Sequence, residues 1–181
     1  MKKIVIILSV FAVIFFGASG IKSVRSTSKY ILVDKSYHLL FVKNGESIER
    51  IIPVCVGSGG DNVTPAGNYT ITSIVHHPNW YFEGRTYAPY PDDPENGLGI
   101  IWMGISLPSY GLHGTNEPFS PGRDFSHGCV RMNNSDIAKL ADNSFIGESV
   151  EIREGYDDSL AKHLEIITTI YNIENFLKEA D

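Results

Sequence analysis

A turn signal at Asn44-Gly45, placed between two runs rich in apolar residues, constrains the fold of this chain more than any other feature. The runs are HLLFVK before the turn and SIERIIPVCVG after it, and a further run, YILVD, begins at Tyr30. Asn-Gly favours the tight turn of a β-hairpin because both residues tolerate positive φ. The sequence therefore predicts that the body of the protein opens as an antiparallel meander.

The remainder of the body predicts more strands than helices. Strand patterns recur in TPAGNYTITSIV, IIWMGISL, SYGLHG and GESVEIRE. Residues 76–100 are interrupted by prolines and rich in aromatic residues, which predicts a long loop of the kind that forms lids or binding surfaces. A short helix is expected in NNSDIAKLADN, with Asn134 or Ser135 as its N-cap. These patterns predict a single, mostly β domain.

The two ends of the chain have patterns of their own. Lys2 and Lys3 precede an apolar run that ends in small residues near Gly20, which predicts a secretory signal peptide over residues 1–20. The run is also nearly long enough to remain as a membrane anchor, and either outcome places the body outside the cytoplasm. Residues 158–178 space apolar side chains by threes and fours, which predicts an amphipathic helix within a C-terminal extension over 156–181. We expect this helix to pack on the domain.

Charge and cysteine content exclude two classes of protein. The net charge of −6 comes without a basic stripe, which argues against a nucleic-acid partner. The chain has 2 cysteines, Cys55 and Cys129, too few for a disulfide framework. Cys55 falls in a strand pattern and is expected to be a small core residue. Cys129 instead lies in the segment SHGCVRM, close to His127 and His113, which indicates a reactive thiol.

Residues 110–132, YGLHGTNEPFSPGRDFSHGCVRM, bring together the groups from which a nucleophilic site is built. Cysteine is a strong nucleophile as the thiolate, and a nearby histidine can take its proton. Both His113 and His127 are candidates for that base. Gly114 and Gly128 permit close approach of the backbone to a substrate. The pattern predicts that Cys129 is a catalytic thiol.

Other interpretations of the same stretch stay open on the residues alone. His113, His127 and Cys129 could be three ligands of a catalytic zinc ion, although no HExxH or CxxC pattern supports this. Ser126 as a serine nucleophile is less favoured because it lacks a nucleophile-elbow context. Arg131 could bind a substrate carboxylate or brace the loop.

Four segments in order resemble the L,D-transpeptidases of the YkuD type, which remodel bacterial peptidoglycan. SHGCVRM at 126–132 is similar to the family's SHGC-hydrophobic-R signature, and YGLHGTNEP at 110–118 is similar to the strand that brings its histidine. TPAGNYTI at 64–71 resembles the TPxGxF/Y turn, and the run from PNW to LGIIWMGISL resembles the segment before the histidine strand. The resemblance covers most of residues 29–155.

The resemblance implies a fold and a set of site residues. The fold is an L,D-transpeptidase-like antiparallel β sandwich with a short helix beside the site. Cys129 would be the nucleophile and His113 its general base, with the Gly114 carbonyl orienting the imidazole. The residues implied to shape the loop and the oxyanion site are Gly114, Ser126, His127, Gly128 and Arg131. Aromatic residues of the long loop would line the substrate groove or pin the loop: Trp80, Tyr81, Tyr87 and Tyr90.

The resemblance also implies a reaction. Cys129 would attack the carbonyl of the L-centre of a diamino acid in a tetrapeptide stem, expel the terminal D-alanine, and pass the acyl group to an amine, forming 3,3-type crosslinks. Water as acceptor would make the enzyme a carboxypeptidase. The thiol chemistry needs no metal or organic cofactor. We expect a monomer whose partners are peptidoglycan stem peptides. A wall-protein attachment enzyme of the same fold and a non-catalytic wall- or zinc-binding module are the alternatives.

Overall fold

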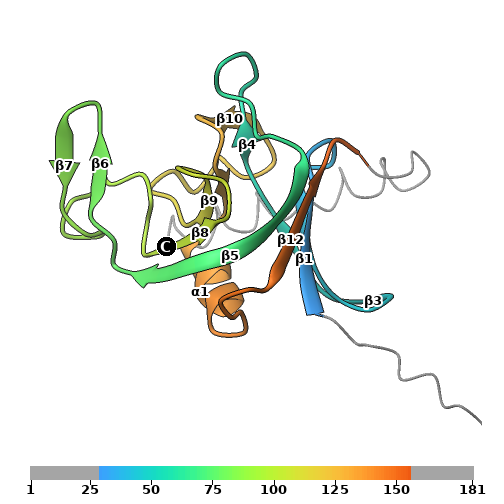
Figure 1. The fold of residues 1–181 in the computed structure, drawn as a ribbon. Helices are drawn as coiled ribbons and strands as arrows, with labels where there is room; N and C mark the ends of the chain where they lie inside the picture. Colours follow the sequence, from blue (N-terminus) through green and yellow to red (C-terminus); the bar gives the residue numbers. More distant parts are fainter. Residues whose placement is uncertain (1–28, 156–181) are drawn as a thin grey trace, which may run out of the picture.

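The computed structural model describes residues 29–155, which fold into one curled, mostly β structure with a short helix against its inner face (Figure 1). The predicted signal peptide over 1–20 and the predicted C-terminal helix lie outside the described residues. In chain order, the elements are β1 (Lys29–Asp34), β2 (Leu39–Asn44), β3 (Ser47–Pro53), β4 (Val56–Gly57), β5 (Gly67–His76), β6 (Trp80–Phe82), β7 (Arg85–Tyr87), β8 (Ile101–Ile105), β9 (Gly111–His113), β10 (Asp124–Ser126), β11 (Val130–Arg131), α1 (Asn134–Ala141) and β12 (Ser149–Arg153).

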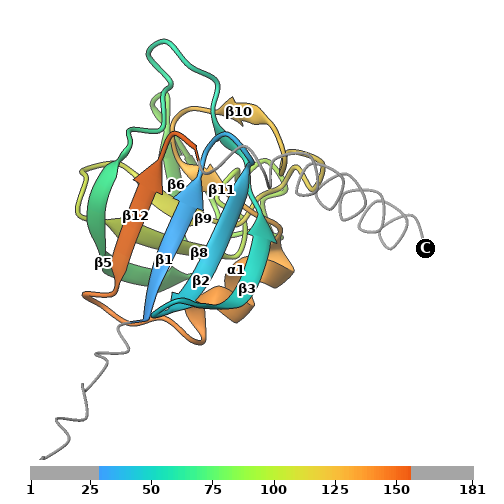
Figure 2. The same cartoon turned by 90° about the vertical axis from the view of Figure 1, so that its right-hand side faces the viewer.

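The main sheet differs from the expected antiparallel β sandwich. It is one 8-stranded mixed sheet in the order β11-β9-β8-β5-β12-β1-β2-β3. β12 pairs parallel to β1, and β11 pairs parallel to β9, whereas the other neighbours are antiparallel. The sheet curls around its own core, so its two ends face each other in place of two separate layers (Figure 2). The parallel pairs arise because the chain crosses over before β11 and, through α1, before β12.

The meander predicted at Asn44-Gly45 is confirmed. β1 pairs with β2, and β2 pairs with β3 around the Asn44-Gly45 turn. Gly45 has a φ of 58°, the left-handed conformation that the Asn-Gly signal anticipates.

The expectation of one long loop over residues 76–100 is wrong in part. β5 extends to His76, and a hairpin of β6 and β7 follows, with Trp80 opposite Tyr87. The turn of this hairpin is formed by Glu83 and Gly84, whose φ angles are 49° and 80°. Two consecutive positive φ values match the twist of the flanking strands, which is why a tight hairpin forms here.

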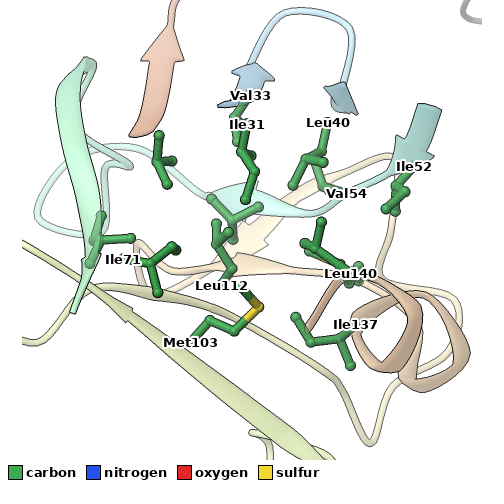
Figure 3. Close-up of a cluster of buried hydrophobic side chains, with 14 of the residues drawn as sticks. Ile31, Val33, Leu40, Ile52, Val54, Ile71, Met103, Leu112, Ile137 and Leu140 are labelled. Carbon is green, nitrogen blue, oxygen red and sulfur yellow. The ribbon is translucent and has the colours of Figure 1, made fainter. Parts of the chain in front are cut away.

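The core lies between the curled sheet and α1 (Figure 3). Strand residues at alternate positions supply most of it, and Ile137, Leu140 and Ala141 of α1 close it. Cys55 is fully buried in this core, as predicted for a small apolar residue. Burial of so many aliphatic side chains is the main force that fixes the position of α1 beside the sheet.

The helix begins one residue earlier than expected. Its N-cap is Asn133, in place of Asn134 or Ser135, and the Asn133 side chain makes no capping hydrogen bond. The Asn134 side chain does not cap the helix, because its Oδ1 accepts hydrogen bonds from the backbone N–H groups of Ile100 and Thr115.

Within residues 29–155, no helix is long and apolar enough to cross a membrane.

Candidate active site

Three neighbouring strands place one row of side chains in the core and the alternate row on the opposite face of the sheet. Met103 of β8 pairs with Leu112 of β9, and Leu112 pairs with Val130 of β11; all these residues are core residues. One position along, Trp102 pairs with His113, and His113 pairs with Arg131. Because side chains alternate between the faces of a sheet, Trp102, His113 and Arg131 share the face away from the core.

That face forms the floor of a cavity of about 580 Å³. The predicted site residues that line it are His113, His127, Cys129, Arg131, Trp80 and Tyr81. The structure therefore brings the two candidate bases and the thiol into one cavity, from β9 and from the loop between β10 and β11. Its lining also includes Val75, Leu98, Phe82, Trp102 and Ser109, which sequence reasoning did not single out.

His113 is held as a neutral imidazole with one nitrogen available as a base. Its Nδ1 lies 2.7 Å from the carbonyl oxygen of Gly114. A carbonyl only accepts hydrogen bonds, so Nδ1 carries the proton and Nε2 keeps its lone pair. Burial, reinforced by the positive charge of Arg131, lowers the pKa of His113 from 6.5 to about 3, against the opposing effect of the Gly114 carbonyl.

Cys129 is a half-buried thiol, and neither it nor Cys55 is in a disulfide. Its Sγ lies 3.7 Å from the carbonyl oxygen of Ser109. Burial raises the pKa of Cys129, whereas the backbone of Gly111 and the charge of Arg131 oppose that rise. At neutral pH the resting site therefore holds a thiol and a neutral imidazole.

The loop before Cys129 is fixed by Ser126. Its Oγ donates a 2.6 Å hydrogen bond to the carbonyl oxygen of Cys129 and accepts one from the N–H of Gly128 at 3.1 Å. Gly128 has a φ of 116°, and a Cβ there would approach Tyr110 to 2.8 Å. Only glycine fits that position, because both the conformation and the space exclude a side chain.

A similar restriction applies next to His113. A Cβ atom added to Gly114 would clash with Oδ1 of Asn134, because the two atoms would lie closer together than non-bonded atoms can. Asn134 also donates from its Nδ2 to the carbonyl oxygen of Thr115 at 2.9 Å. The first residue of α1 therefore holds the backbone that follows His113.

Arg131 is anchored by a carboxylate. Its Nη1 lies 3.0 Å from Oε2 of Glu117, and its guanidinium lies 5.9 Å from the ring centroid of Phe125. With 11% of its side chain exposed, Arg131 is the more buried member of the pair, since Glu117 is 46% exposed. The pair keeps a cation at the edge of the cavity.

The four aromatic residues expected in the groove occupy different places. Trp80 and Tyr81 line the cavity, whereas Tyr87 packs against Trp80 with ring centroids 4.8 Å apart. Tyr90 lines a separate cavity of about 210 Å³ beside the start of α1. Phe82, which no sequence pattern had singled out, lies 5.2 Å from the ring of His127 and so connects the β6–β7 hairpin to the loop before Cys129.

Sequence reasoning missed four residues that support the site. Trp102 stacks on His113 with ring centroids 5.8 Å apart. Strand alternation in IIWMGISL, which separates Trp102 from the core residue Met103, was the signal for it. Asn134, Glu117 and Thr64 lie in segments that the sequence analysis had noted, but their roles beside the site were not predicted, because their hydrogen bonds join residues 14 to 64 positions apart in the chain.

The described residues contain no group of three or more histidine, cysteine, aspartate or glutamate side chains placed to hold a metal ion. The three residues considered as zinc ligands thus share the cavity without forming such a group.

Known proteins share the family and the fold of this chain. The family model for the YkuD L,D-transpeptidase catalytic domain matches residues 28–152. The chain is 29% identical to YqjB of Bacillus subtilis over 146 residues, which cover 76% of this chain and 80% of that protein.

Solved structures show the same fold at lower identity. An L,D-transpeptidase from Mycobacterium tuberculosis H37Rv superposes with a TM-score of 0.57 at 18% identity, covering 70% of this chain and 58% of that chain. L,D-transpeptidase 3 from Mycobacterium tuberculosis, in complex with a faropenem-derived adduct, gives a TM-score of 0.55 at 17% identity, covering 70% and 60%. With the family model spanning nearly all of the described residues, the chain belongs to the YkuD family of L,D-transpeptidase catalytic domains.

Proposed function

We propose that this chain is a peptidoglycan L,D-transpeptidase that acts outside the cytoplasm, with Cys129 as nucleophile and His113 as general base. The 2.7 Å contact between His113 Nδ1 and the Gly114 carbonyl supports this most directly. Because this contact keeps the proton on Nδ1, Nε2 is left with the lone pair that a general base needs. His113 lines the same cavity as the Cys129 thiol. Membership of the YkuD family supports the same class of reaction.

In the proposed first half-reaction, Cys129 Sγ attacks the carbonyl carbon at the L-centre of the diamino acid of a tetrapeptide stem. The thiol proton passes to Nε2 of His113 as the C–S bond forms. The imidazolium then gives this proton to the amine of D-alanine as the C–N bond breaks. Because burial raises the pKa of the thiol and lowers that of the imidazole, proton transfer accompanies attack and no ion pair forms beforehand.

The negative charge on the substrate oxygen needs a hydrogen-bond donor near Cys129. The N–H of Gly128 is already donated to Ser126. We assign the donor role to the backbone N–H of Cys129 itself. Ser126 holds the backbone of Cys129 in place through its hydrogen bond to the Cys129 carbonyl oxygen. Arg131 adds a positive potential that favours the carboxylate of the departing D-alanine.

In the proposed second half-reaction, an amine from a second stem attacks the thioester. Neutral His113 takes a proton from that amine as the C–N bond forms, and the imidazolium gives this proton to Sγ as the C–S bond breaks, which returns the thiol and the neutral imidazole. Trp80 and Tyr81 of β6 are proposed to hold the stems in the cavity, since both rings line it and broad rings bury substrate at low entropic cost. No metal or organic cofactor takes part in this scheme.

Product analysis with the full chain and a disaccharide tetrapeptide tests the proposal. We expect mass spectrometry to show crosslinked dimers that have lost one D-alanine, and no dimers with Cys129→Ala or His113→Gln. Cys55→Ala is the matched control, because it removes the other thiol, which is buried in the core, and should still yield dimers. Tripeptide without dimers would reassign the enzyme as a carboxypeptidase, and unchanged substrate would contradict an enzymatic role on stems.

The same thiol is proposed to react with β-lactams of the penem and carbapenem type. A similar structure contains a faropenem-derived adduct. Incubation of this chain with faropenem should raise its mass by one covalent adduct, and peptide mapping should locate the adduct on Cys129. An adduct that persists in Cys129→Ala would rule out this assignment.

A further inference from the structure

A second, smaller apolar cluster lies on the outer face of the sheet, opposite the core. Its buried members are Leu32, Leu39 and Phe41, with Tyr30 and Tyr37 packed against them. All of these residues come from β1, β2 and the turn that joins them. The alternate residues of the same strands, such as Ile31 and Leu40, belong to the main core, so both faces of this strand pair are buried.

The burial of this outer face is nearly complete. Leu32 is 1% exposed, Leu39 is 0% exposed and Phe41 is 7% exposed. Within residues 29–155, no helix or strand lies over this face, which is turned toward the viewer in Figure 2. A sheet face open to water leaves its side chains partly exposed. The outer face around Leu32, Leu39 and Phe41 is therefore a candidate docking surface for a segment outside residues 29–155.

The path of the chain identifies the covering segment. Beyond β12, pairing continues, because the N–H groups of Lys35 and Ser36 donate to the carbonyls of Arg153 and Glu154 at 3.0 and 3.1 Å. The described part of the chain thus ends beside the β1–β2 turn, at the edge of the outer cluster. The other chain segment that adjoins these strands, residues 21–28, reads IKSVRSTS and has no apolar stripe.

We propose that the C-terminal segment 156–181 docks on the outer face of β1 and β2 and covers Leu32, Leu39 and Phe41 with its apolar stripe. The stripe consists of Leu160, Leu164, Ile167 and Tyr171, which fall on one side of a helix. A helix from 160 to 171 is about 17 Å long, close to the about 20 Å of a six-residue strand such as β1. The docked segment is a structural part of the catalytic domain, independently of the proposed function.

Thiol labelling of the full chain tests this docking. In a Cys129→Ala background, Phe41→Cys reports access to the outer face, and Cys55, which is fully buried, reports global unfolding. The test change is Leu164→Asp with Ile167→Asp on the apolar stripe. The matched control is Lys162→Asp with Thr169→Asp, which lie on the opposite side of the same helix.

We expect maleimide labelling of Phe41→Cys to be at least about tenfold faster with the stripe variant than with the control variant, while Cys55 stays unlabelled in both. Leu39→Cys, as a second reporter, should respond in the same way. Equal labelling in the two variants would overturn the proposal, as would rapid labelling in the starting protein. Labelling that slows with protein concentration would assign the cover to a second copy and also overturn it.

Discussion

The hydroxyl of Thr64 donates a 2.8 Å hydrogen bond to the carbonyl oxygen of Gly128. The same hydroxyl accepts a hydrogen bond from the N–H of Gly57, also at 2.8 Å. One buried side chain therefore connects the TPAG turn and the end of β4 to the loop before Cys129.

Thr64→Val keeps the shape of this side chain but removes both hydrogen bonds. We expect a loss of about 1–3 kcal/mol in the free energy of unfolding, because two buried backbone groups lose their partner. Denaturant titration measures this loss. Thr86→Val, at an exposed position of β7, is the control and should have little effect. A Thr64→Val protein as stable as the parent would contradict the role of this bond.

Protonation of His113 should make stability depend on pH. The pKa of its folded form is about 3, below the ordinary 6.5, so the unfolded chain binds the proton between these values and the native state does not. Stability contributed by the neutral imidazole is complete above 6.5 and falls as the pH drops toward about 3. In that window the slope should be up to about 1.4 kcal/mol per pH unit.

His113→Gln should remove this slope. Denaturant unfolding of the two proteins at intervals between pH 4 and 6.5 measures the difference. Identical slopes would mean that the imidazole is protonated in the folded protein, which would also argue against its role as a base.

Gly128→Ala should prevent the loop before Cys129 from adopting its observed conformation. Gly147→Ala is the matched control, because Gly147 has a φ of 91° but no atom within 4 Å of a Cβ position, whereas Gly128 faces Tyr110 at 2.8 Å. We expect the control to lose about 1–2 kcal/mol of stability through its backbone conformation alone. Gly128→Ala should lose more than this and should also lose acylation by faropenem. Equal losses and retained acylation would show that the loop tolerates a side chain.

Glu117→Gln should impair turnover with little effect on stability. The Glu117–Arg131 pair lies at the cavity edge, and the carboxylate is partly exposed, so its loss should change the free energy of unfolding by less than about 1 kcal/mol. We expect kcat/KM for the tetrapeptide to fall about tenfold, because Arg131 is no longer oriented. Glu95→Gln, which breaks the exposed 2.6 Å pair with Arg85, is the control and should retain activity. A Glu117→Gln enzyme as active as this control would refute the positioning role.

The local parts of the fold were predictable from the sequence, whereas the closure of the sheet was not. Asn44-Gly45 specifies a hairpin because both its strands and its turn are contiguous in the chain. The parallel pairing of β12 with β1 has no local signal, since it joins Tyr30 to Ser149. The hairpin at Glu83-Gly84 was missed because its short strands contain too few residues for an alternating pattern.

The candidate site, like the fold, has parts that the local sequence predicts and parts that depend on tertiary contacts. The residues from His113 to Arg131 are close in sequence, and glycine, histidine and cysteine together indicate thiol chemistry. Whether an aromatic residue reaches the cavity depends on tertiary contacts, so Tyr87 and Tyr90 could not be separated from Trp80 and Tyr81 by composition. The state of the thiol and imidazole is also a tertiary property, because it follows from burial.

The place of β12 in the sheet has a consequence for how the protein is made. This strand lies between β5 and β1, so it joins the half that contains the site, β5-β8-β9-β11, to the half that contains β1, β2 and β3. It is also the last described strand to be synthesised. The two halves cannot form a continuous sheet until residues 149–153 have been synthesised. Completion of the sheet therefore comes late in synthesis and depends on pairing between strands far apart in the chain. A chain interrupted before Val150 would expose an unpaired strand on each half, and such strand edges are the surfaces on which nascent chains aggregate.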